Sequence, residues 1–154
     1  GLATKDKLAL FGWSYGGYMA NWAITQTDIF KASISVAGVS NLVSLYGQHE
    51  FSNRDIGVWE YKSLPIDNVE NYRKASPIFH VRNVETPLLI LHGANDTRSP
   101  TLQAWEMYRA MEDAEKEVEM MIYPRAGHSI GNPVQFKSVL TNWLEWANRH
   151  IGKE

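Results

Sequence analysis

The sequence predicts an α/β fold in which four mainly parallel strands are flanked by helices. Three observations support this prediction. Short apolar runs alternate with longer segments of helical period, the helical segments follow strands, and glycine or proline marks most of the boundaries. This alternation is typical of a parallel sheet covered on both faces. In such a sheet, the ligand site is expected at the carboxyl ends of the strands.

Four apolar runs are expected to form the strands. They cover residues 7–12, 32–37, 88–91 and 118–123. Each run is short and largely free of charge, which is typical of strands buried on both faces. We therefore expect these four segments to lie side by side at the centre of the molecule.

Three long helices are expected between and after the strands. The first covers residues 15–26, and the other two begin at Ser99-Pro100 and Asn132-Pro133, where a capping side chain precedes proline. Their expected apolar faces are Tyr18, Met19, Trp22 and Ala23 in the first helix, Ala104, Met107, Tyr108 and Met111 in the second, and Phe136, Leu140, Trp143, Leu144 and Ala147 in the third. The stretch from about 40 to 86 is expected to be irregular apart from a short helix near 68–75.

Composition excludes several classes of protein. With 44% hydrophobic and 21% charged residues, the chain is expected to fold rather than to be disordered. A net charge of −2 without a basic cluster argues against nucleic acid as a partner, and no apolar run is long enough for a membrane span. The absence of cysteine excludes disulfides and thiolate metal sites but leaves the compartment open, and we expect the cytoplasm.

The segment 12–17, GWSYGG, has the pattern G-x-S-x-G between an expected strand and an expected helix. In this context a sharp turn presents the serine hydroxyl above the sheet, so Ser14 is a candidate nucleophile. The glycines two residues on either side are expected to let neighbouring backbone pass closely. The N–H of Tyr15 is then a candidate oxyanion donor. The alternative is a glycine-rich turn without chemistry.

Asp96 and His128 complete a candidate catalytic triad. Each follows an expected strand, and the order Ser, Asp, His along the chain is that of α/β-hydrolases. His128 would be the general base, and Asp96 would orient its imidazole. Taken alone, Asp96 could be an aspartate that caps a loop, and His128 an ordinary surface-loop histidine. No histidine pair has metal-ligand spacing, so neither a metal nor a cofactor is expected.

These motifs resemble those of the prolyl oligopeptidase family, above all its acylaminoacyl-peptidase-like and dipeptidyl-peptidase-like branches. The resemblance rests on GWSYGGY at 12–18, on ASPI at 75–78, on TPLLILHG at 86–93 with Asp96, Pro100 and Gln103 after it, and on YPRAGH at 123–128. It implies that residues 1–154 are a single partial α/β-hydrolase domain, the C-terminal half of that fold. The upstream strands, their oxyanion loop and the family's β-propeller would be absent. Ser129 departs mildly from the glycine that the family often has there.

The resemblance implies a serine-type peptidase that cleaves peptide, acyl-peptide or ester bonds through an acyl-serine. The alternatives are a carboxylesterase-like hydrolase and a catalytically weak fragment whose oxyanion hole is incomplete. The resemblance also implies a substrate pocket near Tyr18, Val39 and Leu42, with Arg98 beside it. Plain core packing remains the alternative for the first three residues, and a solvated loop cation is the alternative for Arg98.

The expected partners are a peptide or small ester substrate, with no nucleic acid and no membrane. Strand 7–12 is expected to have an open edge, because its usual neighbour would belong to the missing half of the domain. Unpaired N–H and C=O groups at a sheet edge template pairing with another chain. We therefore expect a homo-oligomer, or association with the missing half.

Overall fold

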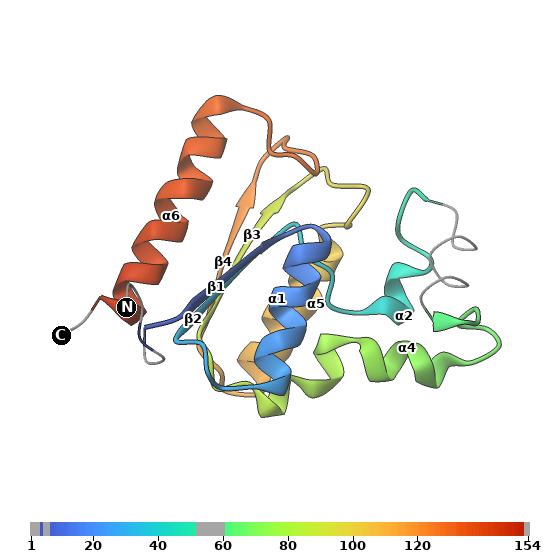
Figure 1. Cartoon of the computed structure of the whole chain (residues 1–154). Coiled ribbons are helices and arrows are strands. Elements are labelled where there is room, and N and C mark those ends of the chain that lie inside the picture. Colours follow the sequence, from blue (N-terminus) through green and yellow to red (C-terminus); the bar gives the residue numbers. More distant parts are fainter. Residues whose placement is uncertain (1–3, 5–6, 52–60, 153–154) are drawn as a thin grey trace.

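Four parallel strands form the sheet of this computed structural model, which describes residues 4, 7–51 and 61–152 (Figure 1). They lie side by side in chain order and are β1 (Ala9–Trp13), β2 (Ala32–Val36), β3 (Leu88–Gly93) and β4 (Val118–Tyr123). All three pairings are parallel, and each predicted strand is found with small shifts at its ends. The predicted α/β fold with four strands is therefore confirmed.

The two central strands are buried along their whole length, which explains why their side chains are apolar apart from Ser33, Ser35 and His92. Side chains alternate between the two faces of a strand. In β3, Leu89 and Leu91 pack in the cluster that includes Trp146, whereas Leu88 and Ile90 pack in the cluster that includes Met107. The sheet therefore separates two apolar cores.

Helix α6 (Pro133–Ile151) covers one face of the sheet, and α1 (Tyr15–Gln26) and α5 (Leu102–Asp113) cover the other (Figure 1). The predicted face of α5 is confirmed, since Ala104, Met107 and Met111 are buried. The predicted face of α1 is wrong in part. Met19 is exposed, and the helix packs through smaller residues, namely Gly17, Ala20, Asn21, Ile24 and Thr25. Small side chains allow this helix to approach the sheet closely.

The predicted start of α5 is also wrong. The helix begins at Leu102, and Ser99 makes no capping contact there. Instead, residues 97–101 form a turn in which the N–H of Ser99 donates to Asp96 Oδ1 at 3.0 Å. The pair Ser99-Pro100 thus belongs to the loop that carries Asp96.

The stretch 40–86 contains more structure than predicted. Besides the expected short helix, found as α4 (Val69–Ala75), it holds α2 (Leu42–Leu45) and a 3₁₀ helix, η1 (Pro77–Asn83). The side chain of Asn41 accepts the N–H groups of Val43 and Ser44 and so begins α2. These elements bury a third apolar cluster beyond the carboxyl ends of the strands, formed by Tyr18, Val39, Leu42, Leu45 and Tyr72.

The predicted face of α6 is confirmed in part, since Ala147 is buried and Trp143 packs against the core on this side of the sheet. Val139, Trp146 and Ala147 are buried, whereas Phe136, Leu140 and Leu144 are 42%, 38% and 57% exposed. This exposed stripe begins beside β1, where the ring of Phe136 lies 6.2 Å from that of Trp13. Within the described residues, β1 pairs only with β2 and so forms one edge of the sheet. None of the described helices is long and apolar enough to cross a membrane.

Candidate active site

Ser14 lies in a strained turn between β1 and α1. Its backbone has φ 59° and ψ −117°, a conformation that side-chain-bearing residues rarely adopt. The N–H of Ser14 donates to the carbonyl of Val36 at 2.9 Å, and its own carbonyl accepts from the N–H of Tyr18 at 3.0 Å. The ends of the turn are therefore fixed to β2 and α1, and they hold the serine in this conformation.

Glycines make the turn possible, but not quite as predicted. A Cβ at Gly12 would lie 1.9 Å from the carbonyl oxygen of Gly16, and a Cβ at Gly17 would lie 2.7 Å from that of Val36. By contrast, a Cβ at Gly16 would meet nothing within 4 Å. The close approaches therefore require glycine at 12 and 17. At Gly16 a side chain would have room, and it is the carbonyl of this residue that lies close to Gly12.

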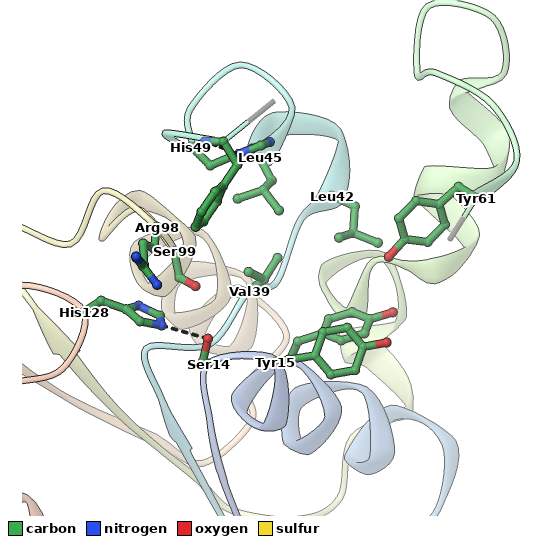
Figure 2. A pocket seen from close by; sticks show the side chains of 12 residues that line it. Ser14, Tyr15, Val39, Leu42, Leu45, His49, Tyr61, Arg98, Ser99 and His128 are labelled. Carbon is green, nitrogen blue, oxygen red and sulfur yellow. Dashed lines mark hydrogen bonds between the residues drawn. The ribbon is translucent and has the colours of Figure 1, made fainter. Parts of the chain in front are cut away.

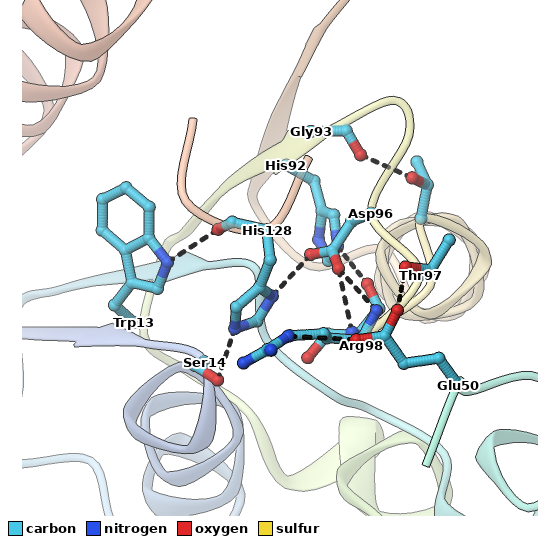
Figure 3. Close-up of polar contacts among 11 residues, drawn as sticks. Trp13, Ser14, Glu50, His92, Gly93, Asp96, Thr97, Arg98 and His128 are labelled. Atoms are coloured by element: carbon cyan, nitrogen blue, oxygen red, sulfur yellow. Dashed lines mark hydrogen bonds and ion pairs between the residues drawn. The ribbon is translucent and has the colours of Figure 1, made fainter. Parts of the chain in front are cut away.

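Ser14, His128 and Asp96 form a continuous hydrogen-bonded chain (Figure 3). Nε2 of His128 lies 2.8 Å from Oγ of Ser14, and its Nδ1 lies 2.8 Å from Oδ2 of Asp96. The three residues lie just beyond the carboxyl ends of β1, β4 and β3 respectively, as the spacing along the chain predicts. The structure thus brings together all three predicted triad residues, in the geometry that a nucleophile, a base and an orienting acid require.

Asp96 combines the two roles that the sequence left as alternatives. Its Oδ1 accepts the N–H groups of Arg98 and Ser99 at 2.9 and 3.0 Å, which closes an Asx turn, while Oδ2 faces His128. Burial by itself would raise the pKa of Asp96, but hydrogen bonds from His92, His128 and the Ser99 N–H, with the attraction of His128, lower it below its ordinary value. The unfolded chain therefore binds this proton more tightly, and the stabilisation from the ionised carboxylate at neutral pH is lost in acid.

Backbone contacts hold the acid loop against the histidine loop. The N–H of Ala94 donates to the carbonyl of Tyr123 at 2.9 Å, and that of Asn95 donates to Ala126 at 2.8 Å. Indole Nε1 of Trp13 donates to the carbonyl of His128 at 3.1 Å. The three segments that carry Ser14, Asp96 and His128 are therefore joined by these bonds in addition to the contacts among the triad side chains.

A cavity of about 180 Å³ opens beside Ser14 and His128 (Figure 2). Its wall is mainly apolar and includes all four predicted substrate-binding residues, namely Tyr18, Val39, Leu42 and Arg98. Pockets that enclose a whole drug-sized ligand are larger, roughly 300–1,000 Å³. A cavity of this size next to a nucleophile is suited to one side chain of a substrate.

The four predicted residues differ in how they are held. Val39 and Leu42 are buried and pack in the third apolar cluster, so core packing and pocket lining coincide there. The hydroxyl of Tyr18 donates to the carbonyl of Ala75 at 2.9 Å. Arg98 is paired with Glu50, its Nε lying 3.0 Å from Oε1, and its side chain is 56% exposed, so it lines the cavity and is also the solvated loop cation of the alternative (Figure 3).

Sequence reasoning missed part of the cavity wall. Leu45, His49, Phe51, Tyr61 and Ser99 also line it. The signal for Leu45 was present, since Asn41 followed by leucines three residues apart is a capped helical turn. The other lining residues lie in segments without periodicity, so no local pattern indicated them.

Gln103 fixes this wall to the start of α5. Its buried Oε1 accepts the N–H groups of Ser40 and Asn41 at 3.1 and 2.9 Å, and its Nε2 donates to Ser44 and Gln48, at 2.9 Å each. One amide thus satisfies the backbone where the chain turns from β2 towards α2. Because the same helix follows the Asp96 loop, the apolar wall is held in a fixed relation to the triad.

No group of three His, Asp or Glu side chains is placed to hold a metal ion in the part of the chain that the structure describes. The polar groups at the cavity include the hydroxyl of Ser14 and the imidazole of His128, and the buried carboxylate of Asp96 lies behind that imidazole, which is the set that acyl transfer requires. The parallel sheet, the strained serine turn and the order of the three residues define the α/β-hydrolase class.

Comparison with known proteins gives the family. The model of the prolyl oligopeptidase family matches residues 1–154, and the chain belongs to this family. The uncharacterized peptidase YuxL of Bacillus subtilis is 35% identical over 94% of this chain and 22% of its own length. The rat acylamino-acid-releasing enzyme is 29% identical over 95% of the chain and 21% of its own length.

Solved structures give the same result. The acylaminoacyl peptidase of Pyrococcus horikoshii matches 98% of this chain with a TM-score of 0.86 and 37% identity, over 25% of its own chain. A puromycin-hydrolyzing peptidase of Mycobacterium tuberculosis matches 99% with a TM-score of 0.89 and 27% identity, over 23% of its chain. The present chain thus spans between a fifth and a quarter of the length of these relatives.

Proposed function

We propose that this chain carries the catalytic residues of a serine-type peptidase that cleaves peptide, acyl-peptide or ester bonds through an acyl-serine. The observation that carries the proposal is the unbroken chain from Ser14 through His128 to Asp96 at the mouth of an apolar cavity. Membership of the prolyl oligopeptidase family supports it.

Each residue of the triad has one task in the proposed reaction. Nε2 of His128 takes the hydroxyl proton as Oγ of Ser14 attacks the carbonyl carbon, and it then passes that proton to the leaving amine or alcohol. Water attacks the acyl-serine by the same route, releasing the acid and restoring the hydroxyl. Asp96 holds the imidazole with Nδ1 protonated and stabilises the imidazolium.

The oxyanion is proposed to lie at the N-terminus of α1. Tyr15 is the first residue of that helix and follows the nucleophile directly. Its N–H therefore belongs to the end of the helix that carries the positive part of the macrodipole. A typical oxyanion hole has at least two donors, and loss of one costs about 10²–10³ in turnover. The activity of this chain alone thus measures how complete its oxyanion hole is.

Turnover of two substrate types by the purified chain tests the proposal. Aminoacyl p-nitroanilides report on amide cleavage, and the matching p-nitrophenyl esters report on the easier acyl transfer. Cleavage of both supports a peptidase, and cleavage of esters alone supports a carboxylesterase-like hydrolase. A chain that cleaves neither and is not labelled at Ser14 by a fluorophosphonate would contradict the proposal.

The cavity predicts a preference for an apolar side chain next to the scissile carbonyl. Val39, Leu42 and Leu45 line it (Figure 2), and Arg98, which also lines it, forms an ion pair with Glu50. N-acetyl-phenylalanine p-nitrophenyl ester should therefore react at least about tenfold faster, as kcat/KM, than the N-acetyl-aspartate ester. The leaving group is the same in both, so the difference reports on the pocket. Equal rates would contradict this assignment of the cavity.

The open edge of β1 predicts association with another strand. Unpaired backbone groups at this edge lie beside the exposed side chains of Phe11 and Phe136, and burying such apolar surface contributes about 25 cal/mol per Å². For the purified chain, we expect the partner strand to be β1 of a second copy in a twofold dimer. Light scattering at micromolar concentration should give at least the dimer mass, and the replacement Phe11→Lys should lower it. A folded species of monomer mass would contradict the prediction.

A further inference from the structure

The imidazole of His92 is buried directly behind Asp96, and the proposed mechanism gives it no task. The side chain is 0% exposed at the end of β3. Its Nε2 lies 2.6 Å from the carbonyl oxygen of Ser99 and 3.3 Å from Oδ2 of Asp96 (Figure 3). Its Nδ1 is also buried and has no hydrogen-bond partner among the described residues.

These contacts define the protonation state of His92. A carbonyl oxygen only accepts hydrogen bonds, so Nε2 must carry a proton that it donates to Ser99. A second proton on Nδ1 would be a buried donor without an acceptor among the described residues. The ring is therefore the neutral Nε2–H tautomer. Its single N–H lies between the Ser99 carbonyl and the Asp96 carboxylate.

The same N–H closes the loop that carries the acid. Asp96 Oδ1 accepts the N–H groups of Arg98 and Ser99, and the carbonyl of Ser99 is held by His92. Without this donor, the buried Ser99 carbonyl would lose its side-chain partner, and the turn that orients Asp96 would lose one of its attachments to β3. The others are bonds from Thr101 Oγ1 and the Asp96 N–H to the carbonyl of Gly93. The carboxylate faces two imidazoles, His92 from β3 and His128 from the loop after β4.

We propose that His92 is a positioning residue of the active site: its neutral Nε2–H holds the Asp96 loop so that Oδ2 meets Nδ1 of His128. The catalytic meaning of this inference rests on the proposed function. Its physical content does not, because the protonation state of one ring and the hydrogen bond of another can be observed without turnover.

Nuclear magnetic resonance of the whole chain with ¹⁵N-labelled histidine tests the tautomer first. We expect His92 to show a protonated Nε2 and an unprotonated Nδ1 at neutral pH. A ring protonated on Nδ1, or on both nitrogens, would overturn the proposal without any variant being made.

Two variants test the positioning itself. H92F keeps an aromatic ring but removes the donor, whereas H92Q places an amide N–H close to the position of Nε2. We expect the low-field proton signal of the His128 Nδ1–H to be present in the wild type and in H92Q, and to be lost in H92F. A signal that persists unchanged in H92F, or that is lost equally in H92Q, would overturn the proposal. If H92F does not fold, the His128 signal in H92Q and the tautomer of His92 in the wild type decide whether the proposal holds.

Labelling of Ser14 by a fluorophosphonate gives the catalytic readout. H92F should react more slowly by about tenfold to 10²-fold, because a small displacement of a catalytic group has effects of this order. H92Q should react within about threefold of the wild type, and binding of the probe should be unchanged because His92 does not line the cavity. Equal rates in H92F and the wild type would overturn the proposal. A wild-type chain that is not labelled at all contradicts the proposed function, while the resonance signals still decide the role of His92.

Discussion

Replacing Ser14 by alanine should abolish labelling of the chain by a fluorophosphonate and lower turnover by roughly 10⁶-fold. The reason is that Oγ of Ser14 is the atom that His128 Nε2 contacts at 2.8 Å and the one that would form the acyl bond. Alanine fits the strained turn no worse than serine, so the fold should be retained. Intact mass after treatment with the probe measures the adduct directly, and circular dichroism checks the fold.

Ser99→Ala is the matched control for this experiment. Ser99 lines the same cavity, but its hydrogen bonds to Asp96 and His92 are made by the main chain. That variant should therefore keep the adduct. An adduct that persists in Ser14→Ala would place the nucleophile elsewhere and contradict the assignment.

Replacing Asp96 by asparagine should lower kcat by about 10⁴-fold with little loss of structure. The amide oxygen can still accept the N–H groups of Arg98 and Ser99, which keeps the turn. The amide nitrogen, however, replaces the oxygen that faces Nδ1 of His128. The imidazole must then leave Nδ1 unprotonated and carry its proton on Nε2, where it cannot accept the proton of Ser14.

Steady-state hydrolysis of a p-nitrophenyl ester measures this loss, with thermal unfolding as the check on structure. Asp113→Asn, at the exposed end of α5, is the control that removes one carboxylate far from the serine turn. It should leave kcat unchanged. Activity of Asp96→Asn within about tenfold of the wild type would show that the carboxylate does not orient the base.

The strands could be predicted because their environment is simple. The central strands β2 and β3 are buried on both faces, so their side chains are small or apolar with the exception of His92. The triad followed from the strands, since the loops at the carboxyl ends of parallel strands meet at one edge of the sheet. Ser14, Asp96 and His128 each lie within a few residues of the end of a strand, and the glycine-rich segment 12–17 indicated Ser14 as the candidate nucleophile.

The helix faces could be predicted only in part. Helix α6 has apolar residues on more than one side, and both Phe136 with Leu140 and Val139 with Trp146 satisfy the helical period. Which pair meets the sheet depends on the rotation of the helix about its axis. The preceding loop sets this rotation, and that loop is anchored by the buried side chain of Ile130. Local periodicity contains no information about this rotation.

The sequence by itself predicted the candidate triad and the four parallel strands whose carboxyl ends bring its members together. Only the tertiary structure decided how the site is supported: Gln103 contacts the backbone of Ser40 across 63 positions of sequence, and the ring of His92 lies behind Asp96 with one shared N–H. The physical reason is the separation along the sequence of the residues that interact. Strands and turns follow from neighbouring residues, whereas a buried amide or imidazole finds its partner only when distant segments pack.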